Sequence, residues 1–361
     1  MGVAPAAEPE VEGTMAALTI VRRRVGCMNL AMWGKALRVI PRLEKDEWRR
    51  LDVVSRWLIS TRALVLIMTF ISAAMAGMLA FRDGRFNLGP WLLLTIGLIM
   101  AHATNNLLND LTDYRKGVDK DNYFRTQYGP QPLEQGLMTQ RELLIYAGAT
   151  GLVALAAGAA LVYLRGPLAL VLLGMGAFFV LFYTWPLKYI GLGELAVLVV
   201  WGPLMIGGGY FVVTGVWDWN VVLASLPYAL GPTTVIFGKH IDKYAEDKAR
   251  GIHTLPVLIG ERAGRFAVLG MMAMQYFLVL YLVAIRFFTP TMLVVLFALS
   301  AVPQVWGLYR RPKPAQKPKD CPGDTWPLYF VAVAFLHNRR FGLWFLLGLL
   351  GDALLHVVRI A

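Results

Sequence analysis

The sequence predicts an all-α, polytopic membrane protein in which about nine transmembrane helices form a bundle. Hydrophobic residues make up 57% of the 361 residues and charged residues only 16%, and the mean hydropathy is +0.54. A soluble domain carries about 25% charged residues, so the composition excludes a soluble globular fold and a disordered chain. The two cysteines, Cys27 and Cys321, are too few for a disulfide scaffold and lack metal-ligand spacing, so we expect free thiols.

The predicted helices are runs of about 20 nearly uncharged residues, the length that crosses the core of a bilayer. One further apolar stretch, residues 326–337, is too short to cross and either lies at the membrane interface or extends the last helix. The predicted spans are residues 57–81, 90–108, 142–164, 167–185, 193–214, 221–238, 266–285, 290–309 and 341–359.

The net charge of +12 and the pI near 9.8 would suggest nucleic acid in a soluble protein. In a membrane protein they indicate topology instead, because Lys and Arg collect in cytoplasmic loops. With a cytoplasmic N-terminus, 27 of the 35 Lys and Arg residues fall on the cytoplasmic side and five on the other. We therefore expect no nucleic-acid partner and a multi-pass protein of a prokaryotic cell membrane. The cytoplasmic segments are residues 1–56, 109–141, 186–192, 239–265 and 310–325.

The chain divides into a basic N-terminal tail, residues 1–56, and a membrane domain, residues 57–361. Three consecutive arginines at 22–24 resemble the start of a signal peptide, but polar residues interrupt the apolar stretch and no cleavage site follows. Residues 28–40 instead predict an amphipathic helix on the membrane surface.

A polar stripe runs along the second predicted span into its cytoplasmic end. Positions three and four apart share a helix face, and Gly117 allows a turn that brings Asp119 back toward the stripe. Close carboxylates repel one another unless a cation lies between them, and loosely held oxygen ligands suit Mg²⁺. The alternative is a helix end with solvated acids and amides bonded to a neighbouring helix. The stripe comprises His102, Asn106, Asn109, Asp110 and Asp113.

A second cluster, of mixed charge, follows the sixth predicted span and ends at Gly251. Helical spacing places Lys239, Lys243, Asp247 and Arg250 on one face, and Asp242 and Glu246 on the adjoining face. Acids for a metal and bases for an anion fit a metal–diphosphate complex. The alternative is a salt-bridged amphipathic helix, because acids and bases four residues apart form ordinary pairs.

With both clusters in these positions, the sequence resembles the UbiA superfamily of intramembrane prenyltransferases, which carries acidic motifs after its second and sixth spans. Residues 109–119 (Asn-Asp-x-x-Asp-Tyr-x-x-Gly-Val-Asp) resemble the first motif of its 1,4-dihydroxy-2-naphthoate polyprenyltransferases, the menaquinone branch. Residues 183–194, 202–215 and 247–260 resemble further stretches of that branch, and the resemblance covers residues 57–310.

The chain departs from the family at one place. Before the last Asp of the second motif the family usually has Asn-Asn-x-Arg-Asp, whereas this chain has Lys239-His240-Ile-Asp242-Lys243. An Asp stands where Arg is expected, and a Lys stands where the first Asp is expected. The departure implies either a second metal held by other acids or a different acceptor.

The resemblance implies Mg²⁺-dependent transfer of a polyprenyl group from polyprenyl diphosphate to an aromatic acceptor, 1,4-dihydroxy-2-naphthoate, giving demethylmenaquinone. It also implies a central cavity that opens to the cytoplasm and holds the prenyl tail among the apolar spans. The implied metal ligands are Asp110, Asp113 and Asp119, and Asp247 with Asp242 or Glu246. The implied cations for the diphosphate are Lys116, Lys188, Lys243 and Arg250, with Arg125. The implied pocket residues are Tyr183, Tyr189, Asn106, Asn109 and Glu194.

Other readings remain open at this point. The same chemistry on 4-hydroxybenzoate, homogentisate, a chlorophyllide or a lipid alcohol is the nearest alternative. The chlorophyllide branch ranks low, because it carries Arg where this chain has Tyr114. A transporter or divalent-cation channel would use the carboxylates as an ion path, but transporters often show two matching halves and the sequence shows no such repeat. Glu194 and Trp185 also have alternative, structural roles. Glu194 can pair with a nearby Lys, and Trp185 can belong to an interfacial aromatic belt.

Overall fold

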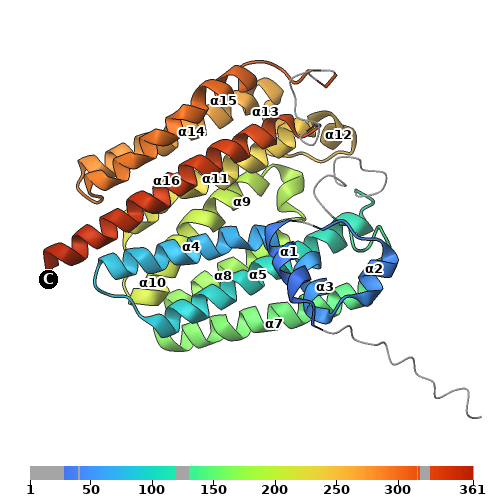
Figure 1. The fold of residues 1–361 in the computed structure, drawn as a ribbon, viewed down its shortest axis with the longest axis horizontal. Coiled ribbons are helices and arrows are strands. Elements are labelled where there is room, and N and C mark those ends of the chain that lie inside the picture. The colour runs from blue at the N-terminus through green and yellow to red at the C-terminus, as the bar shows by residue number, and fades with distance from the viewer. Residues whose placement is uncertain (1–27, 40, 119–129, 315, 318–325, 361) are drawn as a thin grey trace, which may run out of the picture.

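The computed structural model describes residues 28–39, 41–118, 130–314, 316–317 and 326–360, and all regular structure in these ranges is helical. The long helices lie along a common axis and form one elongated bundle (Figure 1). They are α4 (Ala63–Arg82), α5 (Leu88–Arg115), α7 (Gln140–Arg165), α8 (Pro167–Phe182), α11 (Trp219–Asp242), α14 (Glu261–Ala284) and α16 (Tyr329–Ile360).

Two further spans are composite. The first joins α9 (Gly193–Val199), the π-helical η3 (Val200–Gly207) and α10 (Gly208–Thr214), and the second joins the 3₁₀ helix η4 (Pro290–Ala301) to α15 (Val302–Tyr309). Pro203 lies inside η3 and has no amide hydrogen to donate to a helical hydrogen bond, consistent with the wider winding there.

Seven helical stretches in the described ranges are long and apolar enough to cross a membrane. α8 is apolar but only 16 residues long. The sequence prediction of an all-α membrane bundle is therefore confirmed, while the total of nine spans stays a prediction. The seven stretches are Ala63–Arg82, Leu88–Arg115, Gln140–Arg165, Gly193–Thr214, Trp219–Asp242, Glu261–Ala284 and Pro290–Tyr309.

Two predicted boundaries differ from the structure. The predicted span 57–81 is interrupted, because α3 (Val53–Ser60) and α4 meet at Arg62, whose φ of 55° lies in the left-handed region. At the other end of the chain the short apolar stretch 326–337 joins the last span, since α16 is a single helix of 32 residues. Residues 338–340 therefore lie inside this helix.

The N-terminal helices pack at one end of the bundle. α1 (Leu30–Arg38), α2 (Lys45–Arg50) and α3 lie at the same end as α12 (Tyr244–Ala249), opposite the C-terminus (Figure 1). Their apolar side chains form a cluster with the ends of α5 and α7. The described part of the N-terminal tail is thus packed against the bundle. This cluster includes Ala36, Trp48, Ile59, Leu107, Leu111 and Leu143.

Asp52 fastens α1 to α3. Its carboxylate accepts hydrogen bonds from the Ser55 backbone at 2.9 Å, from the Trp33 indole at 3.1 Å and from the Asn29 backbone at 3.2 Å. Burial raises the pKa of Asp52, but these hydrogen bonds together outweigh burial and lower the pKa from 3.8 to about 2. A depressed carboxyl pKa stabilises the fold above about pH 4, and this contribution is lost as the pH falls through about 2.

At neutral pH we expect Asp52→Asn to loosen α1 from the bundle, because a neutral amide replaces the charged acceptor. Limited trypsin digestion should then cleave after Lys35 and Arg38 several-fold faster than in the wild type. The exposed Asp46, in α2, provides the control variant Asp46→Asn, which should leave the rate unchanged. Equal cleavage rates in all three proteins would contradict this role of Asp52.

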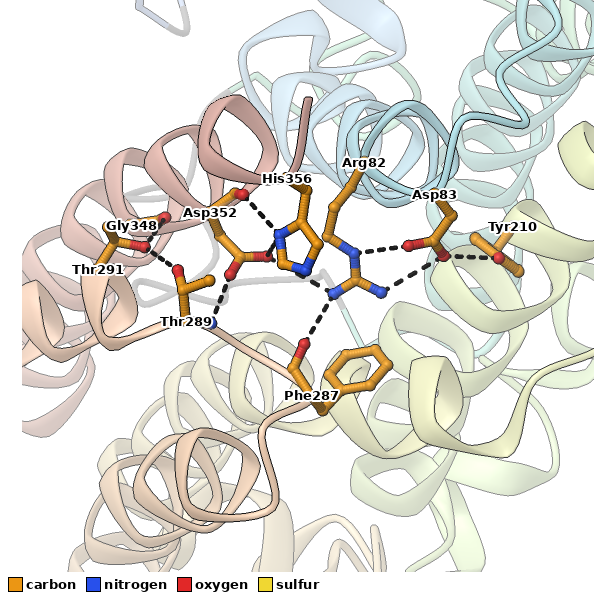
Figure 2. Close-up of polar contacts among 9 residues, drawn as sticks. All are labelled: Arg82, Asp83, Tyr210, Phe287, Thr289, Thr291, Gly348, Asp352 and His356. Atoms are coloured by element: carbon orange, nitrogen blue, oxygen red, sulfur yellow. Dashed lines mark hydrogen bonds and ion pairs between the residues drawn. The ribbon is translucent and has the colours of Figure 1, made fainter. Parts of the chain in front are cut away.

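A distal polar cluster closes the opposite end of the bundle (Figure 2). Arg82, at the end of α4, lies 2.8 Å from Asp83 and 3.6 Å from Asp352 of α16, and its guanidinium stacks over the Phe287 ring at 4.3 Å. Asp352 is fully buried and also accepts a 2.6 Å hydrogen bond from the Thr289 backbone. The cluster therefore links the first and last long helices through a buried ion pair.

Replacing Asp352 by Ala should destabilise the protein by about 3 kcal/mol, because it leaves the buried Arg82 guanidinium without one of its two carboxylates. The measurement is the thermal unfolding midpoint of the detergent-solubilised protein. Arg85→Ala is the matched control, since Arg85 lies at the same end of the bundle but is exposed. An unchanged midpoint for Asp352→Ala would show that the ion pair contributes nothing to stability.

Candidate active site

The amides of the polar stripe on α5 hold neighbouring segments in place. Asn106 donates its side-chain N–H to the Thr61 carbonyl at 2.8 Å, just before α4 begins. Asn109 donates to the Thr184 hydroxyl at 3.0 Å, in the segment after α8. Both asparagines also line a cavity in the bundle. The predicted helical face therefore exists, and its amides connect α5 to both flanking segments.

The break between α3 and α4 brings a cation to the first carboxylate. Arg62 forms an ion pair with Asp110, whose side chain is only 4% exposed. Arg62 also lines the cavity. Arg62 was not among the predicted site residues, because the predicted span 57–81 runs through it. A charge within an apolar run is nevertheless costly and commonly functional.

Asp113 is paired with a lysine from a different loop. The Lys188 ammonium lies 3.4 Å from both carboxylate oxygens of Asp113. Lys188 belongs to η2 (Leu187–Ile190), and it lines the cavity together with Asp113 and Tyr183. The motif 183–194 and the first acidic cluster, separate in the sequence, are thus brought together as the resemblance implies.

Lys116 and the two aromatic residues beside it lie outside the cavity lining. The Lys116 ammonium is 5.0 Å from the Trp185 ring centroid and 4.7 Å from that of Tyr189, and Lys188 is 5.9 Å from Tyr189. Tyr189 was predicted to line the pocket, whereas in the structure it supports two lysines through cation–π contacts. Trp185 is 52% exposed.

The second acidic cluster bends where the sequence predicts one continuous helical face. α11 ends at Asp242 and α12 begins at Tyr244, yet Lys243 still lies 3.2 Å from Asp247. Asp247 is 1% exposed, and neither of its carboxylate oxygens accepts a hydrogen bond from the described residues. This is a buried carboxylate with coordination capacity to spare.

Arg250 joins the two clusters. Its guanidinium donates a hydrogen bond to the carbonyl of Val118, which follows the end of α5. Asp113 and Val118 line the same cavity as Lys243, from the other cluster. The two acidic motifs therefore meet at one end of the bundle, the end that also carries α1–α3 (Figure 1).

Asp242, a predicted metal ligand, has other partners in the structure. Its carboxylate accepts hydrogen bonds from the backbone amides of Phe330 and Val331, each at 3.0 Å, and lies 3.5 Å from the Lys313 ammonium. Asp242 thus caps the N-terminus of α16, where unpaired helical amides favour a negative charge. It does not line the cavity.

Glu246 and Glu194 also have places that differ from the predictions. Glu246 is exposed on α12 and does not line the cavity, so its position disfavours the predicted metal ligation. Glu194 is 1% exposed and lies 2.6 Å from His240, and it accepts a hydrogen bond from the Leu255 backbone at 3.2 Å. Glu194 thus links α9, α11 and α13 (Leu255–Ile259), and its contact with substrate stays a prediction.

The cavity has a volume of about 650 Å³ and two chemically different ends. The end near the acidic clusters is polar, and Lys239 and His240, absent from the predicted site, lie there together with the groups described above. Beyond this end the lining is mostly apolar. The apolar part includes Leu94, Leu98, Gly158, Leu161, Leu172 and Val212. A molecule with a charged head and an apolar tail fits this arrangement.

The donor set fits a divalent cation. Among the described residues no three His, Cys, Asp or Glu side chains converge on one point. However, Asp113 lines the polar end, and Asp110 and Asp247 are buried carboxylates whose ion-pair partners Arg62 and Lys243 line it. Asp247 also has two oxygens that receive no hydrogen bond from the described residues. Carboxylate oxygens suit Mg²⁺, which keeps part of its coordination shell for water or phosphate. The predicted ligand Asp119 and the predicted cation Arg125 lie outside the described residues.

Comparison with known sequences places the chain among prenyltransferases. Its most similar relatives include the UbiA prenyltransferase domain-containing protein 1 homolog of Drosophila melanogaster, 26% identical over 223 residues, which are 57% of this chain and 58% of the relative. The 1,4-dihydroxy-2-naphthoate octaprenyltransferase of Escherichia coli K12 is 29% identical over 215 residues, 57% of this chain and 68% of the relative. The match therefore spans about six to seven tenths of each relative.

Solved structures share the fold. A digeranylgeranylglyceryl phosphate synthase structure superposes with a TM-score of 0.59 at 15% identity, covering 83% of this chain and 98% of the other. A UbiA homolog from Archaeoglobus fulgidus bound to GPP and Mg²⁺ superposes with a TM-score of 0.55 at 15% identity, covering 82% and 99%. Residues 70–321, more than half of the chain, match the profile of the UbiA prenyltransferase family. The chain therefore belongs to the UbiA prenyltransferase family, whose members are membrane enzymes that transfer prenyl groups.

Proposed function

We propose that this protein transfers a polyprenyl group from polyprenyl diphosphate to an aromatic acceptor, 1,4-dihydroxy-2-naphthoate, in a Mg²⁺-dependent reaction that gives the reduced (quinol) form of demethylmenaquinone. The observation that carries the proposal is a set of three carboxylate–cation pairs whose cations line the polar end of an otherwise apolar cavity. These pairs are Arg62–Asp110, Lys188–Asp113 and Lys243–Asp247.

Each pair contains the two groups that a metal–diphosphate complex requires, a carboxylate for the metal and a cation for the diphosphate. Asp110, Asp113 and Asp247 would hold Mg²⁺, together with Asp119 as a predicted ligand. Bound Mg²⁺ supplies positive charge to the leaving diphosphate. With metal on the carboxylates, Arg62, Lys188 and Lys243 would be free to bind phosphate oxygens, and Lys116 and Arg250 are the further predicted cations for the diphosphate. The pairs therefore keep buried charges neutralised until substrate enters.

The chain supports the transfer step by excluding water. As the allylic C–O bond breaks, positive charge develops on the prenyl carbon, and the apolar lining keeps water from that carbon. The Tyr183 ring lines the cavity beside Asp113 and Lys188, where its π face suits a developing cation. An electron-rich carbon of the acceptor forms the new C–C bond, and a proton or carbon dioxide leaves from the same ring.

Two observations support the naphthoate as acceptor. The motif at 109–119 resembles the naphthoate branch, and the relative of E. coli K12 is named for that reaction. A second candidate is a different acceptor on the same site, favoured by the relatives named UbiA prenyltransferase domain-containing protein 1 and by the residues at 239–243.

A transfer assay separates these acceptors. Membranes containing the protein are given labelled geranylgeranyl diphosphate and Mg²⁺ with either 1,4-dihydroxy-2-naphthoate or 4-hydroxybenzoate. We expect the label in a naphthoate product, and membranes without the protein serve as the control. If the label appears only in prenylated hydroxybenzoate, 4-hydroxybenzoate is the acceptor instead of the naphthoate. Diphosphate release without either product would retain the enzyme class but reject both acceptors.

The site and the N-terminal helices are proposed to face the cytoplasm. Nine Lys or Arg residues lie in segments 28–56 and 239–243, at the end of the bundle that carries the acidic clusters. α1 exposes Leu30 and Leu37 beside Lys35 and Arg38, and Met28, just before this helix, is exposed as well. This pattern suits the predicted position on the membrane surface.

A further inference from the structure

The cavity has two walls of different chemistry. The wall formed by α7 and α8 is apolar and combines large aliphatic side chains with small residues, including Gly151, Ala154, Gly158, Gly176 and Ala177. The wall formed by α4, α5, α11 and α16 carries polar groups well below the carboxylates, and two of these, His102 and Asn338, have no role in the reaction as proposed above.

Asn338, on α16, is a buried amide that faces the cavity without a protein partner. Its residue is 6% exposed and lines the cavity, and its side chain makes no hydrogen bond with any described residue. The amide oxygen packs against Gly231 of α11, where any Cβ would overlap it. The amide is therefore accessible from the cavity, where it can hydrogen-bond a ligand that enters.

His102, on α5, presents one ring nitrogen to the same cavity. Its Nδ1 lies 2.7 Å from the hydroxyl of Thr69, which is fully buried. Thr69 has no other side-chain hydrogen bond among the described residues, so this contact occupies Nδ1. The Trp201 ring meets the imidazole edge-on at 5.5 Å and limits its rotation. Nε2 is thus the ring nitrogen that remains for a ligand, as a donor or an acceptor according to the tautomer.

Both groups lie at a similar depth. His102 is eight residues from Asp110 along α5, which corresponds to about 12 Å. Asn338 is eight residues beyond Phe330, whose amide contacts Asp242 at the end of α11, again about 12 Å. They therefore lie below the charged end of the cavity, where a neutral oxygen is tolerated and a carboxylate is not.

We propose that Asn338 and His102 bind the ring hydroxyl of the aromatic acceptor that lies farthest from its carboxylate. The carboxylate then stays at the polar end, beside Lys239, and the prenyl tail occupies the α7–α8 wall. This inference rests on the proposed function and names the substrate class: a flat aromatic acid with a hydroxyl on the far side of the ring. Both 1,4-dihydroxy-2-naphthoate and 4-hydroxybenzoate have this form.

The test compares two acceptor-site ligands in the full-length protein. 1,4-Dihydroxy-2-naphthoate carries the far hydroxyl, and 1-hydroxy-2-naphthoate lacks it. We expect the wild type to bind the first about tenfold more tightly in detergent-solubilised binding measurements. Asn338→Leu, which has nearly the same shape, should lose this preference and raise the KM for the naphthoate about tenfold, with the KM for geranylgeranyl diphosphate unchanged.

A matched variant on the opposite wall should do the reverse. Ala154→Leu is expected to raise the KM for geranylgeranyl diphosphate and to leave the acceptor preference intact. If Asn338→Leu does not fold, His102→Phe provides the second variant, with the same expected loss of preference. An unchanged tenfold preference in the folded variants would overturn the inference while leaving the proposed function standing. If the wild type transfers the prenyl group to neither acceptor, the proposed function itself is contradicted.

Discussion

Replacing Asp247 by Asn is expected to lower kcat for prenyl transfer about a thousandfold. Asp247 is a carboxylate with 1% exposure whose oxygens receive no hydrogen bond from the described residues, and its ion-pair partner Lys243 lies 3.2 Å away. An amide keeps the shape but loses the charge that a divalent cation requires. The measurement is the initial rate of transfer at saturating geranylgeranyl diphosphate and Mg²⁺.

Glu246→Gln is the matched control for Asp247→Asn. It removes a carboxylate from the preceding position of the same short helix, but the Glu246 side chain is exposed whereas that of Asp247 is buried. The control should keep at least half of the wild-type rate. If Asp247→Asn also keeps such a rate in folded protein, the second acidic cluster has no part in metal binding.

Replacing Arg62 by Gln is expected to raise the KM for geranylgeranyl diphosphate and lower kcat/KM about a hundredfold. Arg62 lines the cavity and pairs with Asp110. In the proposed reaction it moves from the carboxylate to a phosphate oxygen. Because the variant also frees Asp110 from a competing cation, the Mg²⁺ concentration at half-maximal rate should not increase.

Arg49→Gln is the corresponding control, since the Arg49 side chain is 78% exposed and pairs only with a neighbouring exposed Asp46 among the described salt bridges. A loss of activity in Arg62→Gln that is accompanied by a higher Mg²⁺ requirement would contradict the exchange of partners. Such a result would indicate that Arg62 stabilises the break between α3 and α4 rather than binding the diphosphate.

The fold class followed from the sequence because a bilayer imposes a length on every apolar helix. The polar stripe on α5 was also predictable, because helical periodicity alone places Asn106, Asn109, Asp110 and Asp113 on one face. These predictions depend on neighbours within four residues in the chain, and local spacing determines such contacts.

Residues with distant partners were assigned less well. The amides that Asp242 caps lie 88 and 89 residues farther along the chain, and His240, the partner of Glu194, lies 46 residues away. No local pattern reveals such contacts. Arg62 was overlooked for another reason: one charge among many apolar residues hardly changes the hydropathy of a window, although its cost within a membrane is large.

The structure gives a physical account of the departure at residues 239–243. Asp242 stabilises the N-terminus of α16, and Lys243, at the position where the family usually has an Asp, neutralises Asp247. The second cluster therefore contributes two lysines to the cavity lining, Lys239 and Lys243, and places one buried carboxylate, Asp247, beside Lys243. This balance suits a diphosphate, which carries more negative charge than one divalent cation offsets.

The most direct test is the rate of diphosphate release from geranylgeranyl diphosphate as Mg²⁺ is titrated, in membranes supplied with 1,4-dihydroxy-2-naphthoate. We expect no diphosphate release when the metal is removed by chelation, and we expect release to resume as Mg²⁺ is added back. One prenylated naphthoate should form for each diphosphate released. Release that is independent of divalent cations, or its absence in folded protein with every prenyl diphosphate offered, would contradict the proposed function.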